Sequence, residues 1–240
     1  MKIDANTIIG EIVKVNYKTA QVFEAHNIDF CCGGSISLSE ACKKASINTN
    51  ELIPKLEAMV QLPDADSKYM DGLELDELCD YIVRRHHTYV LENMPFIQQK
   101  LQKLCDVHGE NHAELYEIRQ LFDGAVENLS AHMHKEENIL FPHIKKMVNF
   151  KKENRKSDLI SEKVLEPIHQ MELEHSIEGE RFANMVKLTN NYTCPADGCS
   201  TYQVTFKSLQ DFELDLHRHI HLENNILFKK AVILEEELTI

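Results

Sequence analysis

The sequence predicts an all-α protein in which a small helical N-terminal domain precedes an up-down four-helix bundle. Glycine and proline are scarce, at 8 and 6 of 240 residues, which favours helices over turns and strands. Over most of the chain apolar residues recur every three or four positions, the spacing of one helix face, and no alternating strand pattern of useful length occurs. A ten-residue segment is also repeated, which indicates a duplicated structural unit.

The N-terminal domain is expected to span residues 1–62. Apolar periodicity predicts helices over 7–15 and 17–26. Ser37 and Asn48 each stand three positions before a glutamate, the spacing of a capping box. Two further short helices are therefore expected to begin there and to reach Ala45 and about Val60.

Two segments of this region lack helical periodicity. Residues 27–34 (Asn-Ile-Asp-Phe-Cys-Cys-Gly-Gly) end in two glycines, which are expected to break the helix and to permit left-handed backbone. Residues 61–71 are polar and include Pro63, so they are expected to form a linker to a second domain over residues 71–240.

The second domain is expected to contain four long helices, over residues 75–105, 113–150, 158–188 and 202–237. Pro95, Pro142 and Pro167 fall inside three of them and are expected to kink or interrupt the helix locally. The connections between the helices are short, which is typical of an up-down bundle.

The repeated segment carries the most specific chemical signal. Residues 132–141 (His-Met-His-Lys-Glu-Glu-Asn-Ile-Leu-Phe) recur as residues 219–228 (His-Ile-His-Leu-Glu-Asn-Asn-Ile-Leu-Phe), an offset of 87 residues. In each copy a histidine stands four positions before a glutamate, so the two side chains share one helix face. An imidazole and a carboxylate on one face form half of a transition-metal site. His134 and His221 stand two positions after His132 and His219. They are expected to face away from the side of the helix that carries the histidine and the glutamate.

The first and third long helices each supply one further histidine. His87 and His175 are 88 residues apart, which matches the offset of the repeat and favours His87 over the adjacent His86. Glu174, beside His175, is a candidate to support a ligand by a hydrogen bond or to line an access path, but a place on the surface is the favoured interpretation. The other histidines lack a partner pattern and are expected to be structural. The expected metal ligands are His87, His132, Glu136, His175, His219 and Glu223.

This ligand set favours two cations. Two buried carboxylates would cost several kcal/mol each without a partner, and a pair of metal ions removes that cost. Two glutamates can bridge two metals, which leaves two histidines for each metal and at least one open position. Histidine and carboxylate ligands with open positions favour iron over structural zinc, with manganese as an alternative.

Composition excludes several classes of protein. The net charge of −13 argues against a general nucleic-acid binder. No apolar run approaches the roughly 20 residues of a membrane span, and the N-terminus lacks the layout of a signal peptide. The seven cysteines are not spaced as a disulfide framework, so a reducing cytoplasm is the expected location.

Two pairs of cysteines are candidates for thiol chemistry. Cys31 and Cys32 are adjacent in the glycine-flanked segment, where a thiol near a helix start can have thiolate character. The alternative is that both are small, partly buried residues of a turn. Cys194 and Cys199 have no second pair with which to form a zinc ribbon, so they are expected to be free thiols or an occasional disulfide.

Taken together, these residues resemble the di-iron repair-of-iron-centres proteins of the hemerythrin-like superfamily. The resemblance covers nearly the whole chain and rests on residues 29–34, 85–87, 132–142, 171–175 and 219–228. It implies a hemerythrin-like four-helix bundle that holds two non-haem iron ions, bridged by an oxo group and by carboxylates. It also implies a cytoplasmic role in restoring iron–sulfur clusters damaged by oxidative or nitrosative stress. Cys31 and Cys32 are implied to take part, through thiol chemistry or contact with the damaged cluster.

Three functions remain to be separated. The leading hypothesis is repair of iron–sulfur clusters by iron donation or nitric-oxide chemistry, with damaged iron–sulfur proteins as partners. The first alternative is a sensor or store of oxygen or nitric oxide, which needs the metal and not the thiols. The second is a di-iron nitric-oxide reductase with steady turnover. No nucleic acid or membrane is expected as a partner, and a homodimer is an alternative to a monomer.

Overall fold

The computed structural model describes residues 1–155 and 163–239. These residues confirm the all-α fold class, since they form helices and no strand apart from an isolated antiparallel bridge between Ile8 and Ser37. The chain forms two compact units. The N-terminal unit comprises residues 1–79, 144–164 and 218–240, and the four-helix unit comprises residues 80–143 and 165–217.

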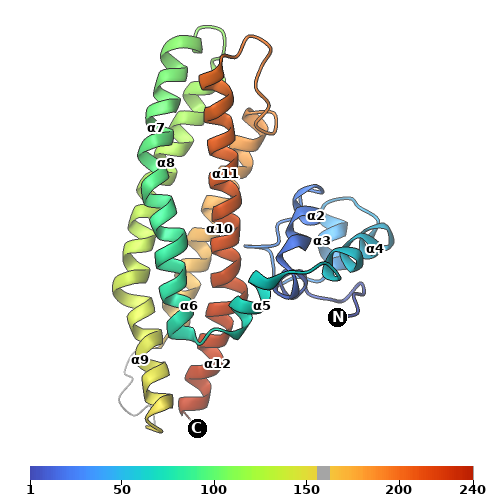
Figure 1. Cartoon of the computed structure of the whole chain (residues 1–240), viewed down its shortest axis with the longest axis vertical. Helices are drawn as coiled ribbons and strands as arrows, with labels where there is room; N and C mark the ends of the chain where they lie inside the picture. Colours follow the sequence, from blue (N-terminus) through green and yellow to red (C-terminus); the bar gives the residue numbers. More distant parts are fainter. Residues whose placement is uncertain (156–162, 240) are drawn as a thin grey trace. The chain divides into compact units, whose positions relative to one another are not determined.

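Four long helices run side by side in the four-helix unit (Figure 1). They are α7 (Thr88–His108), α8 (Glu114–Lys135), α10 (Leu165–Leu188) and the part of α11 (Ser200–Leu222) that precedes residue 218. Short connections join α7 to α8 and α10 to α11, so the helices of each pair run in opposite directions. The periodicity of the sequence predicts this arrangement correctly.

Phe212 marks the centre of the core of the four-helix unit. Its ring on α11 lies 5.4 Å from the ring of Phe122 on α8, 5.8 Å from Phe182 on α10 and 6.3 Å from Tyr89 on α7, measured between centroids. All four helices therefore meet at one aromatic cluster, and such pairs stabilise a core beyond the area that they bury.

Three of the predicted long helices contain a short π-helix. The helix predicted over 75–105 consists of α6 (Leu75–Ile82), the π-helix η2 (Val83–His87) and α7. The helix over 113–150 consists of α8, the π-helix η3 (Glu136–Leu140) and α9 (Phe141–Lys152). The last consists of α11, the π-helix η5 (Glu223–Leu227) and α12 (Phe228–Thr239). Of the helix predicted over 158–188, residues 158–162 lie outside the described residues, and α10 begins at Leu165.

The N-terminal unit begins with short helices at the predicted positions. They are α1 (Ile9–Val15), η1 (Tyr17–Thr19), α2 (Ala20–Glu24), α3 (Leu38–Lys44) and α4 (Thr49–Val60). The predicted caps are present, because Ser37 Oγ accepts a hydrogen bond from the Glu40 backbone and Asn48 Oδ1 accepts one from the Asn50 backbone. Each cap satisfies a backbone donor that the helix itself leaves unpaired.

Two local expectations for this unit were wrong. The predicted linker over residues 61–71 contains a helix, α5 (Ala65–Gly72), because Asp64 caps it by accepting from the backbone N–H and hydroxyl of Ser67. No glycine in the described residues has a positive φ. Gly34 instead allows close packing, since a Cβ there would lie 2.5 Å from Asn225 Oδ1 and 2.6 Å from the Phe30 carbonyl oxygen.

Among the described helices, none combines the length and the apolar character that a bilayer-spanning segment requires.

Candidate metal centre

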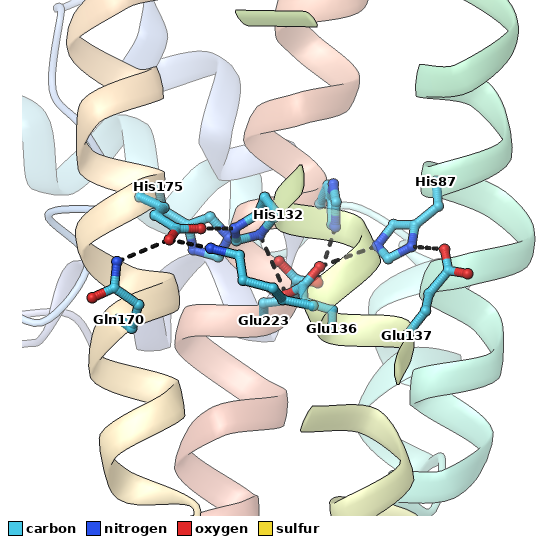
Figure 2. A network of polar contacts seen from close by, with 10 residues as sticks. His87, His132, Glu136, Glu137, Gln170, His175 and Glu223 are labelled. Atoms are coloured by element: carbon cyan, nitrogen blue, oxygen red, sulfur yellow. Dashed lines mark hydrogen bonds and ion pairs between the residues drawn. The ribbon is translucent and has the colours of Figure 1, made fainter. Parts of the chain in front are cut away.

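The four-helix unit gathers four of the six predicted ligands. His87 is the last residue of η2, His132 lies near the end of α8, Glu136 begins η3, and His175 lies in α10. All four side chains are almost completely buried, with exposed fractions of 1%, 3%, 0% and 2%. Figure 2 shows their polar atoms pointing toward one another, with His132 and Glu136 on one continuous helix and His87 and His175 on two others.

Glu136 lies between two histidines. Its Oε2 is 3.3 Å from His87 Nε2, and its Oε1 is 3.4 Å from His132 Nε2. Each oxygen of the carboxylate thus faces a different imidazole. His132 Nε2 is in addition 3.0 Å from His175 Nε2.

Carboxylates on neighbouring helices orient two of these histidines. His87 Nδ1 lies 2.8 Å from Glu137 Oε1, and His132 Nδ1 lies 2.9 Å from Glu174 Oε2. With its Nδ1–H donated to a carboxylate, each neutral ring keeps a lone pair on Nε2, the atom that faces Glu136. A nitrogen lone pair and a carboxylate oxygen repel at such distances unless a proton or a metal cation lies between them.

The neighbours of Glu174 hold it as a carboxylate. Lys135 Nζ donates to Glu174 Oε1 in a close ion pair, and Gln170 Nε2 donates to the same oxygen at 2.8 Å. Burial raises the pKa of Glu174, but hydrogen bonds from Lys135, Gln170 and His132 outweigh burial and lower that pKa to about 2. Sequence analysis considered Glu174 because it adjoins His175, and in the structure its carboxylate contacts His132 on another helix.

A cavity opens beside two of the histidines. It has a volume of about 270 Å³, and its lining includes His132, Lys135, Glu174 and His175. A small ligand or a water molecule can therefore approach these imidazoles from the outside of the four-helix unit.

The N-terminal unit contains the other two predicted ligands. His219 and Glu223 stand one helical turn apart, with 2.9 Å between His219 Nε2 and Glu223 Oε1. Their exposed fractions are 1% and 0%. This pair repeats the spacing of His132 and Glu136, and Glu223 begins η5 as Glu136 begins η3.

The Cys31–Cys32 segment forms a turn around Asp29. The Asp29 carboxylate accepts backbone hydrogen bonds from Cys31, Cys32 and Gly33 at 2.9–3.0 Å. The two sulfur atoms are 3.9 Å apart, and none of the seven cysteines, all of which lie in the described residues, forms a disulfide. One donor atom from each of Asp29, Cys31 and Cys32 lies within 4.8 Å of the others, so these residues form a further candidate group for a cation.

The expected thiolate character does not apply to Cys31. A hydrogen bond with Cys32 and burial raise its pKa well above the ordinary value of 9.0, and the nearby charge of Asp29 acts in the same direction. Cys31 is therefore a neutral thiol at physiological pH, whereas Cys32 is only partly buried.

His221 was expected to face away from the ligand face of its helix, and it is buried in the N-terminal unit. Its ring packs at 5.9 Å from the ring of Tyr17 and 6.2 Å from that of Phe30, and burial lowers its pKa to about 3. Asn225, which follows Glu223 by two residues, donates to the carbonyl oxygens of Phe30 and Cys31 at 3.3 and 3.2 Å. The thiol segment thus contacts the π-helix that carries Glu223. His134, the equivalent of His221, is exposed as predicted.

The donor set fits a transition-metal ion. Two ligand atoms that each lie about 2.1 Å from one cation, with an angle at the cation of roughly a right angle or slightly more, are about 3.0–3.4 Å apart. The two contacts between Glu136 and the histidines match that separation. The chemistry of imidazole and carboxylate donors also matches iron, manganese or zinc, and not a cation that prefers oxygen ligands alone.

Sequence reasoning missed Glu137 and the π-helices. Glu137 acts on His87 across 50 residues of sequence, so no spacing within one helix could reveal it. The π-helices had a weak signal in the repeated Glu-x-x-Ile-Leu-Phe pattern, where the buried Glu136 and Phe141 are five positions apart.

Comparisons with known proteins identify a cation-binding family. A family described as the hemerythrin HHE cation binding domain matches residues 78–231, and a domain of unknown function, DUF542 or ScdA_N, matches residues 5–60. An iron-sulfur cluster repair protein, ScdA, from Staphylococcus haemolyticus is 31% identical, with coverage of 93% of this chain and 97% of the relative. The iron-sulfur cluster repair protein YtfE of Yersinia pestis is 30% identical, with coverage of 95% and 97%.

Proposed function

The chain belongs to the family of hemerythrin-like iron–sulfur cluster repair proteins, and from this premise we propose that it is a di-iron protein that restores damaged iron–sulfur clusters. The observation that carries the proposal is the buried Glu136 carboxylate, whose two oxygens face two different histidines. A carboxylate placed in this way is suited to bridging two cations.

His219 and Glu223 complete the proposed ligand set. They stand on the same helix face as Phe212 and Leu216, because the positions 212, 216, 219 and 223 are separated by three or four residues. Phe212 packs at the centre of the four-helix unit. The face of α11 that carries Phe212 is therefore the face that points into the core of this unit. The six proposed ligands are His87, His132, Glu136, His175, His219 and Glu223, with an oxo group and the two glutamates as the proposed bridges.

The residues around the proposed centre would bind the iron ions and orient the ligands. The iron would supply metal that can be released and would bind nitric oxide. Glu137 and Glu174 hold the Nδ1 protons of His87 and His132 and so keep the Nε2 atoms available as ligands. The cavity beside His132 and His175 gives a small molecule a route to the site. Cys31 and Cys32, with Asp29, are proposed to contact iron of the damaged cluster, which their shared donor group supports.

The metal content tests the ligand assignment. The protein purified without chelator is expected to contain two coupled iron ions per chain by metal analysis and Mössbauer spectroscopy. The double variant His132→Ala, Glu136→Ala should lose both ions and keep its helical circular dichroism. His134→Ala, on the same helix but exposed, is the matched control and should keep them. Stoichiometric iron in the double variant would overturn the assignment.

Replacement of Cys31 and Cys32 distinguishes cluster repair from the alternative functions. Cys31→Ser with Cys32→Ser should keep the iron and lose the ability to reactivate a damaged [4Fe–4S] enzyme. If the variant repairs as well as the unmodified protein, the thiol proposal is wrong. Storage or reduction of nitric oxide would be favoured if the unmodified protein binds or turns over nitric oxide and restores no cluster.

A further inference from the structure

A second group of reactive side chains lies in the four-helix unit, where the connection between α10 and α11 packs on the end of α7. Cys194 and Cys199 belong to this connection, and His108 is the last residue of α7. His108 Nε2 lies 3.3 Å from Cys199 Sγ. None of these three residues takes part in the metal centre.

The connection is folded so that the two cysteines flank a turn. The Gly198 N–H donates to the Pro195 carbonyl oxygen at 2.9 Å, and a four-residue turn of this kind holds its ends within about 7 Å. Cys194 Sγ packs against Gly198, because a Cβ at that glycine would lie 2.4 Å from the sulfur. Gly198 directly precedes Cys199 in the sequence. The Cys194 sulfur therefore contacts the residue next to Cys199. Disulfides need Cα atoms about 4.4–6.8 Å apart, and residues that directly flank a tight turn can come this close.

The two thiols differ in accessibility and in charge. Cys199 is exposed, and Cys194 is partly buried. The contact with His108, together with hydrogen bonds from the backbone N–H groups of Tyr202 and Thr201, lowers the pKa of Cys199 to about 7. Burial and the negative charges of Cys199 and Asp197 raise the pKa of Cys194. At neutral pH about half of the exposed sulfur is therefore thiolate, whereas the second sulfur is a thiol, the order that a nucleophilic and a resolving cysteine require.

We propose that Cys199 and Cys194 form a hydroperoxide-reactive pair, in which Cys199 is oxidised first and Cys194 then closes a reversible disulfide. The Cys199 thiolate attacks a peroxide oxygen, an S–O bond forms, the O–O bond breaks, and the leaving oxygen takes up a proton to give an alcohol or water. The Cys194 sulfur then attacks the Cys199 sulfenic acid, an S–S bond forms, the S–O bond breaks, and the hydroxyl leaves with the Cys194 proton as water. Two thiols are oxidised to one disulfide while one hydroperoxide is reduced.

Peptide mass spectrometry tests the pair directly. The full-length, metal-containing protein is treated with stoichiometric hydrogen peroxide, its remaining thiols are alkylated, and it is digested with trypsin. Lys187 and Lys207 bound a single peptide that contains both cysteines. This peptide should lose two hydrogens, escape alkylation, and recover its original mass after reduction. Two alkylated cysteines in it after peroxide treatment would overturn the proposal.

Three variants test the order of the steps and the role of His108. Cys194→Ser should leave a sulfenic acid on Cys199 that dimedone traps, whereas a label elsewhere would contradict the order. His108→Gln should slow alkylation of Cys199 at pH 7 by about tenfold, because less thiolate is present. His112→Gln is the matched control, since His112 contacts Asp197 in the same connection at 3.0 Å and should change the rate less than twofold. Equal rates in the two histidine variants would contradict the role of His108.

Discussion

The carboxylates behind the histidines decide which ring nitrogen is available to a metal. Glu174 receives the Nδ1 proton of His132, and Lys135 and Gln170 in turn fix Glu174. A carboxylate in this position fixes the ring and makes it a stronger ligand, and its loss costs metal proteins about 10- to 100-fold in affinity. The affinity of the centre therefore depends on residues that would not themselves touch the metal.

Replacement of Glu174 is the first prediction. Glu174→Gln keeps the size of the side chain but removes its charge, so it holds the His132 proton less strongly. We expect iron affinity to fall by about 10- to 100-fold, measured by competition with a chelator, with little change in thermal stability. Glu172→Gln on the exposed face of α10 is the control and should leave affinity unchanged. An affinity in Glu174→Gln equal to that of the control would show that Glu174 does not support the ligand.

Spacing in the sequence identifies residues that share one helix face or that the repeat places in equivalent helices, but it does not identify other contacts between helices. Glu136 follows His132 by one turn, so a shared helix face could be predicted, and Glu174 was considered only because it adjoins His175. Glu137 reaches His87 on another helix and was not identified. Its contact depends on how the helices pack, and the chain contains 39 acidic residues from which to choose.

The π-helices are the feature of the secondary structure most closely associated with the proposed ligands. In η3 and η5 the carbonyl oxygen of the glutamate itself accepts the backbone hydrogen bond from the residue five positions later, Phe141 or Phe228. Lys229 stands where the first repeat has Pro142, yet both segments are π-helical. Proline is therefore not the cause. A π-helix amounts to one extra residue in an α-helix and is frequent at functional sites.

Deletion of a residue from η3 is the second prediction. Ile139 is 57% exposed, so its removal should turn η3 into regular α-helix while Phe141 and the residues after it keep their positions. We expect the helical content to be retained and iron affinity to fall more than 100-fold, because the Glu136 carboxylate is redirected. Ile139→Ala, which shortens the side chain but keeps the π-helix, is the control. Retention of both iron ions in the deletion variant would show that the ligand geometry does not need the π-helix.

The cap of α5 gives a prediction about pH. Asp64 accepts from the Tyr17 backbone at 2.9 Å as well as from Ser67. Burial raises its pKa, but the hydrogen bonds from Ser67 and Tyr17 and the charge of Arg218 outweigh burial and hold that pKa below 3.8. A depressed folded pKa stabilises the protein above pH 3.8, and the contribution is lost as pH falls through the folded pKa.

We therefore expect Asp64→Ala to lower the free energy of unfolding by about 1 kcal/mol at pH 7, measured by urea denaturation. The difference from the unmodified protein should shrink below pH 4. Asp66→Ala removes an exposed ion pair with Arg218 and should cost less than about 0.5 kcal/mol. A difference for Asp64→Ala that stays constant down to pH 3 would contradict the role of the charged cap.

The positions of most helices could be predicted from apolar periodicity and capping residues. The local geometry of the helices, such as the π-helical segments, could not be predicted in this way. Ser37 and Asn48 marked helix starts because their side chains act on neighbouring backbone groups. The same reasoning missed α5, since Pro63 and the polar composition of 61–71 concealed the cap at Asp64. Periodicity also cannot distinguish a π-helix of five residues from the α-helix around it.

Across the whole molecule, the two copies of the repeat have diverged in what surrounds the glutamate. Asn138 and Asn225 occupy equivalent positions in the two copies. Asn138 is exposed and donates to the carbonyl oxygen of His134 at 2.8 Å. Asn225 is 3% exposed and donates to Phe30 and Cys31, with Gly10 and Gly34 close enough to leave no room for a Cβ. The sequence alone could not reveal this difference, because both residues are asparagine.

The equivalent asparagines provide a matched pair of variants for the last prediction. Asn225→Ala leaves the buried carbonyl oxygens of Phe30 and Cys31 without this donor, so the free energy of unfolding should fall by about 1–3 kcal/mol. Cys31, which is 4% exposed, should also react faster with a maleimide, because the thiol segment keeps only the longer hydrogen bond from Asn224 of η5, at 3.4 Å. Asn138→Ala removes the same side chain from a surface position and should change stability by less than about 0.5 kcal/mol. If the two variants unfold at the same urea concentration and Cys31 stays protected in both, then Asn225 does not hold the thiol segment. If instead Asn225→Ala alone releases Cys31, one copy of the duplicated segment positions the thiols next to a proposed iron ligand.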